Sequence, residues 1–243
     1  MPSAIELRGV SVNAPATGDP ILRDIDLCIG AGESVALIGR SGAGKTTTLR
    51  LMNGLVRPSS GAVAIHGVSL DATDIVALRR RTGYIIQGSG LFPHRTVFDN
   101  VATVPRLLEW DEARIKRAVD DALARVGLAR FGERRPRSLS GGEQQRVGIA
   151  RAIVAEPSIL LCDEPFGALD PIVRSELQDT FVALRGGVTV VFVTHDLAEA
   201  MRVAQRIVLF DGGRIVADAP SHAFVDQPVP LVRQFVAAAR IPA

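Results

Sequence analysis

Cysteine is scarce in this sequence, and neither sign of charge is in large excess. The two cysteines, Cys28 and Cys162, each lie inside an apolar run, so they build neither a disulfide framework nor a cysteine-based metal site. A reducing compartment suits such a chain. The 28 lysines and arginines nearly balance the 26 aspartates and glutamates, which leaves a formal charge of +2. That balance lacks the dense basic surface that binds nucleic acid electrostatically, so we expect no nucleic-acid partner.

Long apolar runs are also missing. The longest ones, such as Val188 to Val193, are far shorter than the roughly 20 residues that a membrane-spanning helix needs. The N-terminal residues MPSAIELRGV show no basic segment followed by an apolar stretch, which is the pattern of a secretory signal. We therefore expect the chain neither to be exported by that route nor to span a membrane. Its 47% of hydrophobic and 22% of charged residues exclude overall disorder.

The pattern of the sequence changes near residue 89 and changes back near residue 157. Residues 1–88 have mainly strand patterns, with a helix predicted over Lys45 to Asn53 that Gly54 can terminate. Beyond residue 157, apolar strands alternate with helices, which is typical of a parallel sheet covered on both faces. The predicted strands are Ala4 to Val10, Ile21 to Ile29, Ser34 to Ile38, Ala62 to Ile65, Thr82 to Ile86, Ile159 to Cys162, Val188 to Val193, Ile207 to Phe210 and Arg214 to Ala217.

Residues 89–156 have a helical period. One helix that Gly127 ends carries five apolar residues on one face, namely Ile115, Val119, Ala122, Leu123 and Val126. No repeat, low-complexity tract or Pro/Ser-rich linker separates this block from its flanks. We therefore predict a single domain over residues 1–243, with a core of about 1–88 and 157–243 and an inserted helical subdomain of about 89–156.

A glycine-rich loop carries the strongest chemical signal. Gly39-Arg40-Ser41-Gly42-Ala43-Gly44-Lys45-Thr46 fits the pattern G-x-x-x-x-G-K-[ST], directly after an apolar strand and directly before a helix. Such a loop turns its backbone N–H groups around a polyphosphate, while the helix offers its positive N-terminus. We expect Lys45 to reach the β and γ phosphates of a nucleotide. Thr46 would ligate Mg²⁺, and Thr47 would bind the α phosphate.

A pair of carboxylates ends another apolar strand. Asp163 and Glu164 follow Ile159 to Cys162, and Asp163 is a candidate for holding the Mg²⁺ hydration shell. Glu164 is the candidate general base that takes a proton from the attacking water, a role worth roughly 10²- to 10⁴-fold in rate. The alternative is that both residues merely begin a loop, which Pro165 extends.

The segment Leu139-Ser140-Gly141-Gly142-Glu143-Gln144-Gln145-Arg146 resembles the signature sequence of the ATP-binding cassette (ABC) ATPases. In physical terms, Ser140, Gly141 and Gly142 open a helix and present a hydroxyl and N–H donors to an anion. The resemblance implies that Ser140, Gly141, Gly142 and Glu143 contact a nucleotide held by the other subunit. The alternative is a plain helix cap, with Glu143 as an acidic residue of the first turn.

The remaining family motifs stand in order: Gln87 at a strand end, the turn Ala168-Leu169-Asp170, and His195 after a strand. The resemblance covers about residues 3–220. It implies an α/β P-loop NTPase of the ABC-ATPase fold, with a RecA-like parallel-sheet core, N-terminal antiparallel strands and the inserted helical subdomain. It further implies a head-to-tail dimer, as a homodimer or with a related cassette, that binds two ATP molecules. Gln87 would then touch Mg²⁺ or water, Asp170 would link the subunits, and His195 would contact the γ phosphate.

One family feature is missing. The family usually carries an aromatic residue ahead of the glycine-rich loop that stacks on adenine, and the matching residues Val12 to Pro15 contain none. No Phe, Tyr or Trp precedes Tyr84. Loss of such stacking costs about 1 to 3 kcal/mol, so we expect weak ATP affinity or loose base selectivity.

Two further segments resemble import cassettes. Gly90 to Val101 resembles the segment that receives the helices of a membrane permease, and Leu91, Phe92, Val97 and Phe98 would form its apolar groove. The alternative is that these four residues pack internally. Val101 to Trp110 resembles cassettes of osmoprotectant importers, which take up glycine betaine, choline and related quaternary amines. These likenesses imply permease partners, indirect work with an extracytoplasmic solute-binding protein, and a place at the cytoplasmic face of the membrane.

Other functions compete with that interpretation. An importer of another small solute, such as an amino acid, would carry the same motifs. A soluble ABC protein of translation or DNA repair usually carries two cassettes or a long coiled coil, and neither is visible. A small-molecule P-loop kinase has no need of the signature segment or of His195.

Trp110 is no aromatic cage for a cationic solute, because a cage needs several aromatic faces.

Overall fold

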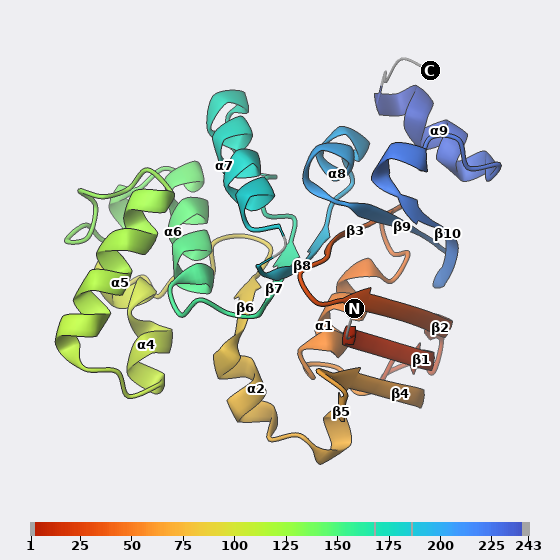
Figure 1. Ribbon diagram of the computed structural model, residues 1–243, viewed down its shortest axis with the longest axis horizontal. Coiled ribbons are helices and arrows are strands. Elements are labelled where there is room, and N and C mark those ends of the chain that lie inside the picture. Colours follow the sequence, from red (N-terminus) through yellow and green to blue (C-terminus); the bar gives the residue numbers. More distant parts are fainter. Residues whose placement is uncertain (1–2, 168, 186, 240–243) are drawn as a thin grey trace.

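Three strands that are buried along their whole length form the middle of the central sheet. The computed structural model describes residues 3–167, 169–185 and 187–239 (Figure 1). In it, every residue of β3 (Ser34–Gly39), β7 (Ile159–Asp163) and β8 (Thr189–Val193) is buried. Such strands need cover on both faces, and a parallel sheet between helices supplies it. The predicted parallel core is confirmed.

The central sheet has the strand order β10-β9-β3-β8-β7-β6, and neighbours from β9 to β6 run parallel. The remaining strands are β6 (Thr82–Ile85), β9 (Arg206–Asp211) and β10 (Arg214–Pro220). β10 pairs antiparallel with β9 at the edge of the sheet, which the sequence interpretation did not foresee. Gly212 and Gly213 join the two strands with φ of +51° and +79°. Positive φ at both turn residues gives a tight hairpin and an antiparallel return.

A second sheet has the order β2-β1-β4-β5 and is antiparallel throughout. Its strands are β1 (Ser3–Asn13), β2 (Pro20–Gly30), β4 (Ser60–Ile65) and β5 (Val68–Ser69). In β2, Leu22, Ile25, Leu27 and Ile29 are buried while most residues between them face outward, as in a sheet with one face on the core. The predicted N-terminal antiparallel strands are therefore confirmed.

Alternate residues of the central strands point into two apolar layers. Val35 and Leu37 of β3 pack with α1 (Lys45–Met52) and the antiparallel sheet, whereas Ala36 and Ile38 pack on the opposite face. In Figure 1, α7 (Pro171–Ala183), α8 (Leu197–Val203) and α9 (Pro230–Ala239) lie on that opposite side. α2 (Ile75–Arg81) leads into β6.

The helices between β6 and β7 gather at one end of the molecule (Figure 1). They are α3 (Val97–Val101), α4 (Thr103–Leu107), α5 (Glu112–Arg125) and α6 (Gly141–Ile153). The predicted apolar face of α5 is buried, and Gly127 follows the helix with φ of +69°. Short 3₁₀ turns occur at Leu70–Ala72, Pro136–Ser138 and Ser221–Ala223. Within the described ranges, no helix is both long and apolar enough to cross a bilayer.

An aromatic cluster ties α7 to the sheet. The rings of Phe166 and Phe181 meet edge to face at 5.0 Å, and Phe192 lies 6.3 Å from Phe166. All three are fully buried.

We therefore predict that Phe181→Ala lowers the free energy of unfolding by about 3 to 5 kcal/mol. Phe92→Ala is the matched control, since Phe92 is 39% exposed, and should cost about 1 kcal/mol or less. Urea unfolding measures both, and equal losses would contradict this packing.

Candidate functional site

A cavity of about 400 Å³ lies where β3, β7 and β8 end. Carboxyl ends of parallel strands are the usual ligand-binding edge of such sheets. The cavity collects the predicted loop residues and the predicted catalytic residues, with the exception of Arg40. Its lining residues are Ile21, Gly39, Ser41, Gly42, Ala43, Gly44, Lys45, Thr46, Thr47, Gln87, Asp163, Glu164, Val193 and His195.

Two glycines allow the loop between β3 and α1 to take its shape. Gly39 has φ of +149°, and a Cβ atom there would collide with the backbone oxygen of Phe210. Gly44 has φ of +98°, and a Cβ atom there would collide with the side chain of Leu22. Only glycine satisfies both demands. Gly44 also stands at the N-cap of α1 and supplies no side-chain cap, so the first N–H groups of this helix lack a side-chain acceptor.

Lys45 is buried beneath this loop. Its ammonium group donates to the backbone oxygens of Gly39 and Arg40, each at 2.8 Å. Burial lowers the pKa of Lys45 below its usual value, while the carboxylates of Glu164 and Asp163 act in the opposite direction. The loop therefore holds a positive charge close to the cavity.

Asp163 connects the end of β7 to the first turn of α1. The Thr46 hydroxyl donates to its carboxylate at 3.1 Å. Burial raises the pKa of Asp163 and the neighbouring Glu164 charge adds to this effect, whereas the Thr46 hydrogen bond and the cations Arg50 and Lys45 lower it. The pair joins a hydroxyl and a carboxylate, which are oxygen ligands of the kind that Mg²⁺ prefers.

Glu164 and His195 are neighbours in the lining of the cavity. Nδ1 of His195 lies 3.4 Å from the Glu164 carboxylate, and the His195 side chain is 72% exposed. Glu164 has φ of +50°, a conformation that costs a non-glycine residue about 1 to 3 kcal/mol. Its backbone N–H donates to Val193 at the end of β8. The fold thus holds this carboxylate in a strained but fixed position beside the histidine.

Gln87 also lines the cavity, two residues after β6 ends. The loop that follows it is bound to α6, because Ser89 donates to the Gln144 side chain at 3.1 Å. Arg151 of α6 donates to the backbone oxygens of Gly90 at 2.8 Å and Ser89 at 3.2 Å. Sequence reasoning missed these contacts, since no spacing rule links positions this far apart. These hydrogen bonds connect the loop that follows Gln87 to α6.

Ser140 begins α6 with a capping box. Its hydroxyl accepts the N–H of Glu143 at 3.2 Å, and the Glu143 carboxylate accepts the N–H of Ser140 at 2.6 Å. That backbone N–H also holds the pKa of Glu143 below its usual value. The helix cap that was the alternative interpretation of this segment is therefore present, and the Ser140 hydroxyl proton has no acceptor among the described residues. Ser140 and Gly141 are exposed, and neither they nor Gly142 and Glu143 line the cavity.

Two other predicted residues lie outside the cavity. Asp170 is the N-cap of α7 and accepts the N–H groups of Ile172 and Val173. The predicted turn also includes Ala168, which lies outside the described residues. Arg40 donates to the side chain of Gln234 in α9 at 2.8 Å. One chain therefore brings together only part of the predicted site.

The family usually has an aromatic residue that stacks on adenine, and the residues that line the cavity show what surface is present in its place. Among the described residues that line the cavity there is no Phe, Tyr or Trp, and Ile21 and Val193 contribute aliphatic surface. Both were absent from the predicted site, because an apolar residue at a strand end carries no chemical signal.

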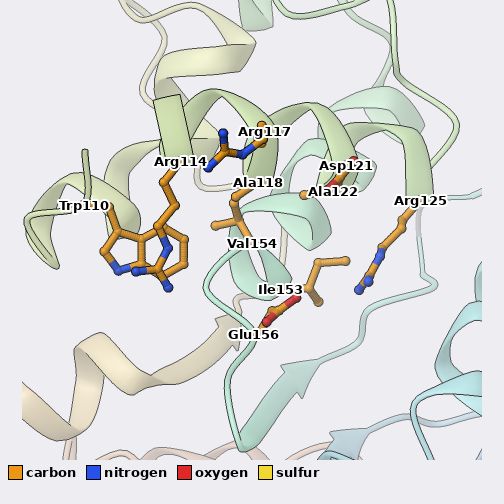
Figure 2. Close-up of a pocket in the computed structure, with 10 residues that line it drawn as sticks. All are labelled: Trp110, Arg114, Arg117, Ala118, Asp121, Ala122, Arg125, Ile153, Val154 and Glu156. Carbon is orange, nitrogen blue, oxygen red and sulfur yellow. The ribbon is translucent and has the colours of Figure 1, made fainter. Parts of the chain in front are cut away.

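A second cavity, of about 190 Å³, lies between α5 and the end of α6 (Figure 2). The Arg114 guanidinium stacks 3.6 Å from the Trp110 ring, as Figure 2 shows. Trp110 is the single aromatic among the described residues around this cavity. One stacked indole does not make the several aromatic faces that a cage for a quaternary amine needs.

The sequence is similar to those of known transport proteins. Residues 22–167 match the ABC transporter family. The chain is 44% identical to the glycine betaine/carnitine/choline transport ATP-binding protein OpuCA of Bacillus subtilis (strain 168), over 92% of this chain and 60% of that protein. It is 45% identical to the glycine betaine uptake system ATP-binding protein YehX of Escherichia coli (strain K12), over 88% of this chain and 71% of that protein. The chain thus spans less than two thirds of the length of OpuCA.

The fold is similar to that of solved ATP-binding cassettes. The dimeric ATP-binding cassette MJ0796 bound to ADP and Pi superposes with a TM-score of 0.83 at 30% identity, covering 89% of this chain and 98% of that one. The predicted P-loop ABC-ATPase fold is therefore confirmed. With the family match over residues 22–167, these likenesses establish that the chain is an ATP-binding cassette and belongs to the ABC transporter family.

Proposed function

We propose that this protein is the ATP-hydrolysing subunit of an importer for glycine betaine, choline or a similar quaternary amine. Hydrolysis at the interface of a head-to-tail dimer drives uptake through a membrane permease. The observation that carries the proposal is the meeting of Lys45, Thr46, Asp163, Glu164 and His195 around one cavity. The relatives named above supply the solute class.

The loop of residues 39–47 binds the phosphates of ATP. The uncapped N-terminus of α1 offers backbone N–H groups, and a helix N-terminus favours anions. Lys45 supplies a positive charge that is partly removed from water, which strengthens its attraction for phosphate. Ile21 offers an aliphatic surface near the loop, in place of the missing aromatic.

Thr46, Asp163 and Gln87 fit a Mg²⁺ ion. The described residues contain no group of three or more His, Cys, Asp and Glu side chains that could hold a metal. Mg²⁺ at phosphoryl-transfer sites, however, takes one or two carboxylates together with water and substrate phosphates. When bound, Mg²⁺ would neutralise the phosphate charge that develops during hydrolysis.

Glu164 acts as the general base and His195 as its neighbour on the γ-phosphate side. A base must come within hydrogen-bond reach of the proton it takes, and Glu164 lines the cavity next to His195. His195 is exposed and free to contact a bound phosphate. The Glu164 backbone N–H donates to Val193, the last residue of the strand that leads to His195.

A second copy of the chain, or a related cassette, completes the site. Ser140 to Glu143 lie outside the cavity of their own chain, and Ser140 and Gly141 are exposed. A solved neighbour, MJ0796, is described as a dimer. Ser140, Gly141 and Gly142 then contact the nucleotide of the partner while Asp170 communicates between subunits. In this scheme residues 89–156 act as a helical subdomain inserted in one domain over 1–243.

The permease would bind near the loop that follows Gln87. Of the four residues predicted for this groove, Val97 is buried and Leu91 and Phe98 pack against the core, whereas Phe92 is 39% exposed. Ile86 and Leu107 are also exposed apolar residues of this region. Phe92 and Ile86 therefore carry the apolar contact, with internal packing accounting for the other three. The protein then sits at the cytoplasmic face of the membrane, and an extracytoplasmic solute-binding protein acts through the permease.

Another small solute is the second candidate. The sulfate/thiosulfate import ATP-binding protein CysA of Methylococcus capsulatus (strain ATCC 33009 / NCIMB 11132 / Bath) is also 44% identical to this chain, over 88% of it. Sequence identity in the cassette thus does not fix the solute. The choice of solute belongs to the partner chains.

The two lysines of the sequence provide a test of the phosphate site. Lys45→Ala removes the buried cation and should weaken ATP binding by at least about tenfold, the range of a lost charge-assisted contact. Lys116→Ala is the matched control, because Lys116 is exposed on α5 and pairs with Asp120. Titration with a fluorescent ATP analogue measures both, and unaltered affinity of Lys45→Ala would be incompatible with the proposed site.

Replacement of the general base tests the chemistry. Glu164→Gln keeps the size of the side chain but cannot accept the proton, so turnover should fall by about 10² or more while ATP still binds. The ATP-bound variant should accumulate as a dimer on size-exclusion chromatography. Glu176→Gln, at an exposed position of α7, is the control. Turnover near the wild-type rate in Glu164→Gln would refute the assignment.

Uptake tests the proposed solute. Cells that express the protein with the permease that co-purifies with it should accumulate labelled glycine betaine, and the Glu164→Gln variant should abolish that accumulation. Sulfate uptake under the same conditions provides the competing outcome. Labelled sulfate entering in place of glycine betaine would retain the ATPase assignment and overturn the solute assignment.

A further inference from the structure

A buried carboxylate behind the cavity has no part in the function described so far. Glu199 of α8 is 8% exposed, and an acid buried to this degree is rare unless it has partners. Its carboxylate accepts the hydroxyl of Thr194 at 2.7 Å. Its other oxygen lies 3.7 Å from Nε of Arg174 in α7. Burial raises the pKa of Glu199, and Thr194 and Arg174 counteract that effect.

The Thr194 side of this contact fixes the loop that carries His195. Thr194 is buried, and its backbone N–H donates to Leu37 of β3. Its hydroxyl oxygen also accepts the N–H of Asp196 at 3.1 Å. Asp196 in turn caps α8 by accepting the N–H groups of Ala198 and Glu199. His195 thus lies between two residues that are both bound to the start of α8.

The Arg174 side reaches the turn before α7. Arg174 donates through Nη2 to the backbone oxygen of Leu169 at 3.2 Å, and its own N–H donates to the backbone oxygen of Asp170 at 2.9 Å. Nε of Arg174 is buried and has no hydrogen-bond partner among the described residues. At 3.7 Å the contact with Glu199 is an ion pair rather than a hydrogen bond, so a small movement of either helix would give Nε its missing acceptor.

We propose that Glu199 and Arg174 are positioning residues, which join the loop of His195 to the turn of Leu169 and Asp170 so that the two segments move together. This inference rests on the proposed function, in which His195 faces the γ phosphate and Asp170 faces the neighbouring subunit. A displacement of Asp170 at the subunit contact then reaches His195 through two side chains. The pair thereby makes hydrolysis in one site responsive to closure of the dimer.

The same two helices supply a matched control. Arg202 of α8 donates to Ser175 at 3.0 Å, to Gln178 at 3.0 Å and to Asp179 at 2.7 Å, all in α7. Its side chain joins α7 to α8, and among the described residues it makes no hydrogen bond to either loop. A substitution of Arg202 therefore measures how weaker packing between α7 and α8 alone affects ATP hydrolysis.

Kinetics on the full chain provide the first test. Glu199→Gln keeps an oxygen that accepts from Thr194 but loses the charge, and Arg174→Met removes the guanidinium. Each should lower kcat for ATP hydrolysis by about tenfold or more, because misplacement of a catalytic group is costly, while KM for ATP stays within about twofold. The kcat of the double variant should be no lower than that of the less active single variant, because both substitutions break the same connection. Arg174→Lys should restore part of the loss.

Hydrogen exchange provides a readout that does not need turnover. In Glu199→Gln, backbone amides in peptides covering residues 164–174 and 193–199 should both exchange faster. Arg202→Met should leave these rates and kcat within about twofold of wild type. A wild-type chain without ATPase activity would contradict the proposed function, and exchange would still decide the present inference. Wild-type kcat in Glu199→Gln, faster exchange in one segment alone, or equal effects of Arg202→Met would overturn it. If Glu199→Gln fails to fold, the two Arg174 variants decide the same question.

Discussion

The parallel pairing of β3, β8 and β7 is the constraint on which the rest of the structure depends. Each strand ends in a different part of the site: β3 in the glycine-rich loop of residues 39–47, β7 in Asp163 and Glu164, and β8 in the loop of His195. Since the three strands are neighbours and run in one direction, their ends meet at one edge. The hydrogen bond between Thr46 and Asp163 spans two of these ends and fixes their separation.

The site contains buried charged groups and a strained backbone conformation, both of which are unfavourable in a protein interior. Burial lowers the pKa of Lys45 and raises the pKa of Asp163. The opposite charge of each group stabilises the charged form of the other and so counteracts both shifts. Glu164 occupies the left-handed region of backbone space. Such features persist where the surroundings over-determine them. Here, the apolar layers on both faces of the central sheet supply that rigidity.

The sequence allowed prediction of whatever depends on local pattern. The loop of residues 39–46, the buried strand before Asp163 and the apolar face of α5 were all predictable because their signals are short-range. The pairing of Glu164 with His195 followed only in outline from strand order, and its distance did not. The antiparallel edge strand β10, the contact of Arg40 with Gln234, and the network of Glu199 and Arg174 were missed. They join segments far apart in the chain, and single residues of these types carry no distinctive pattern.

The central claim is that two cassettes bind ATP between the glycine-rich loop of one and the start of α6 of the other. Cysteine crosslinking tests it most directly, with Ser41→Cys in one chain and Gly141→Cys in another, both carrying Cys28→Ser to remove the exposed native thiol. A Cβ atom at Gly141 meets nothing within 4 Å, so the substitution leaves the helix intact. In the Glu164→Gln background, ATP should produce a crosslinked pair with a short bismaleimide and ADP should not. Absence of that product at saturating ATP would contradict the account.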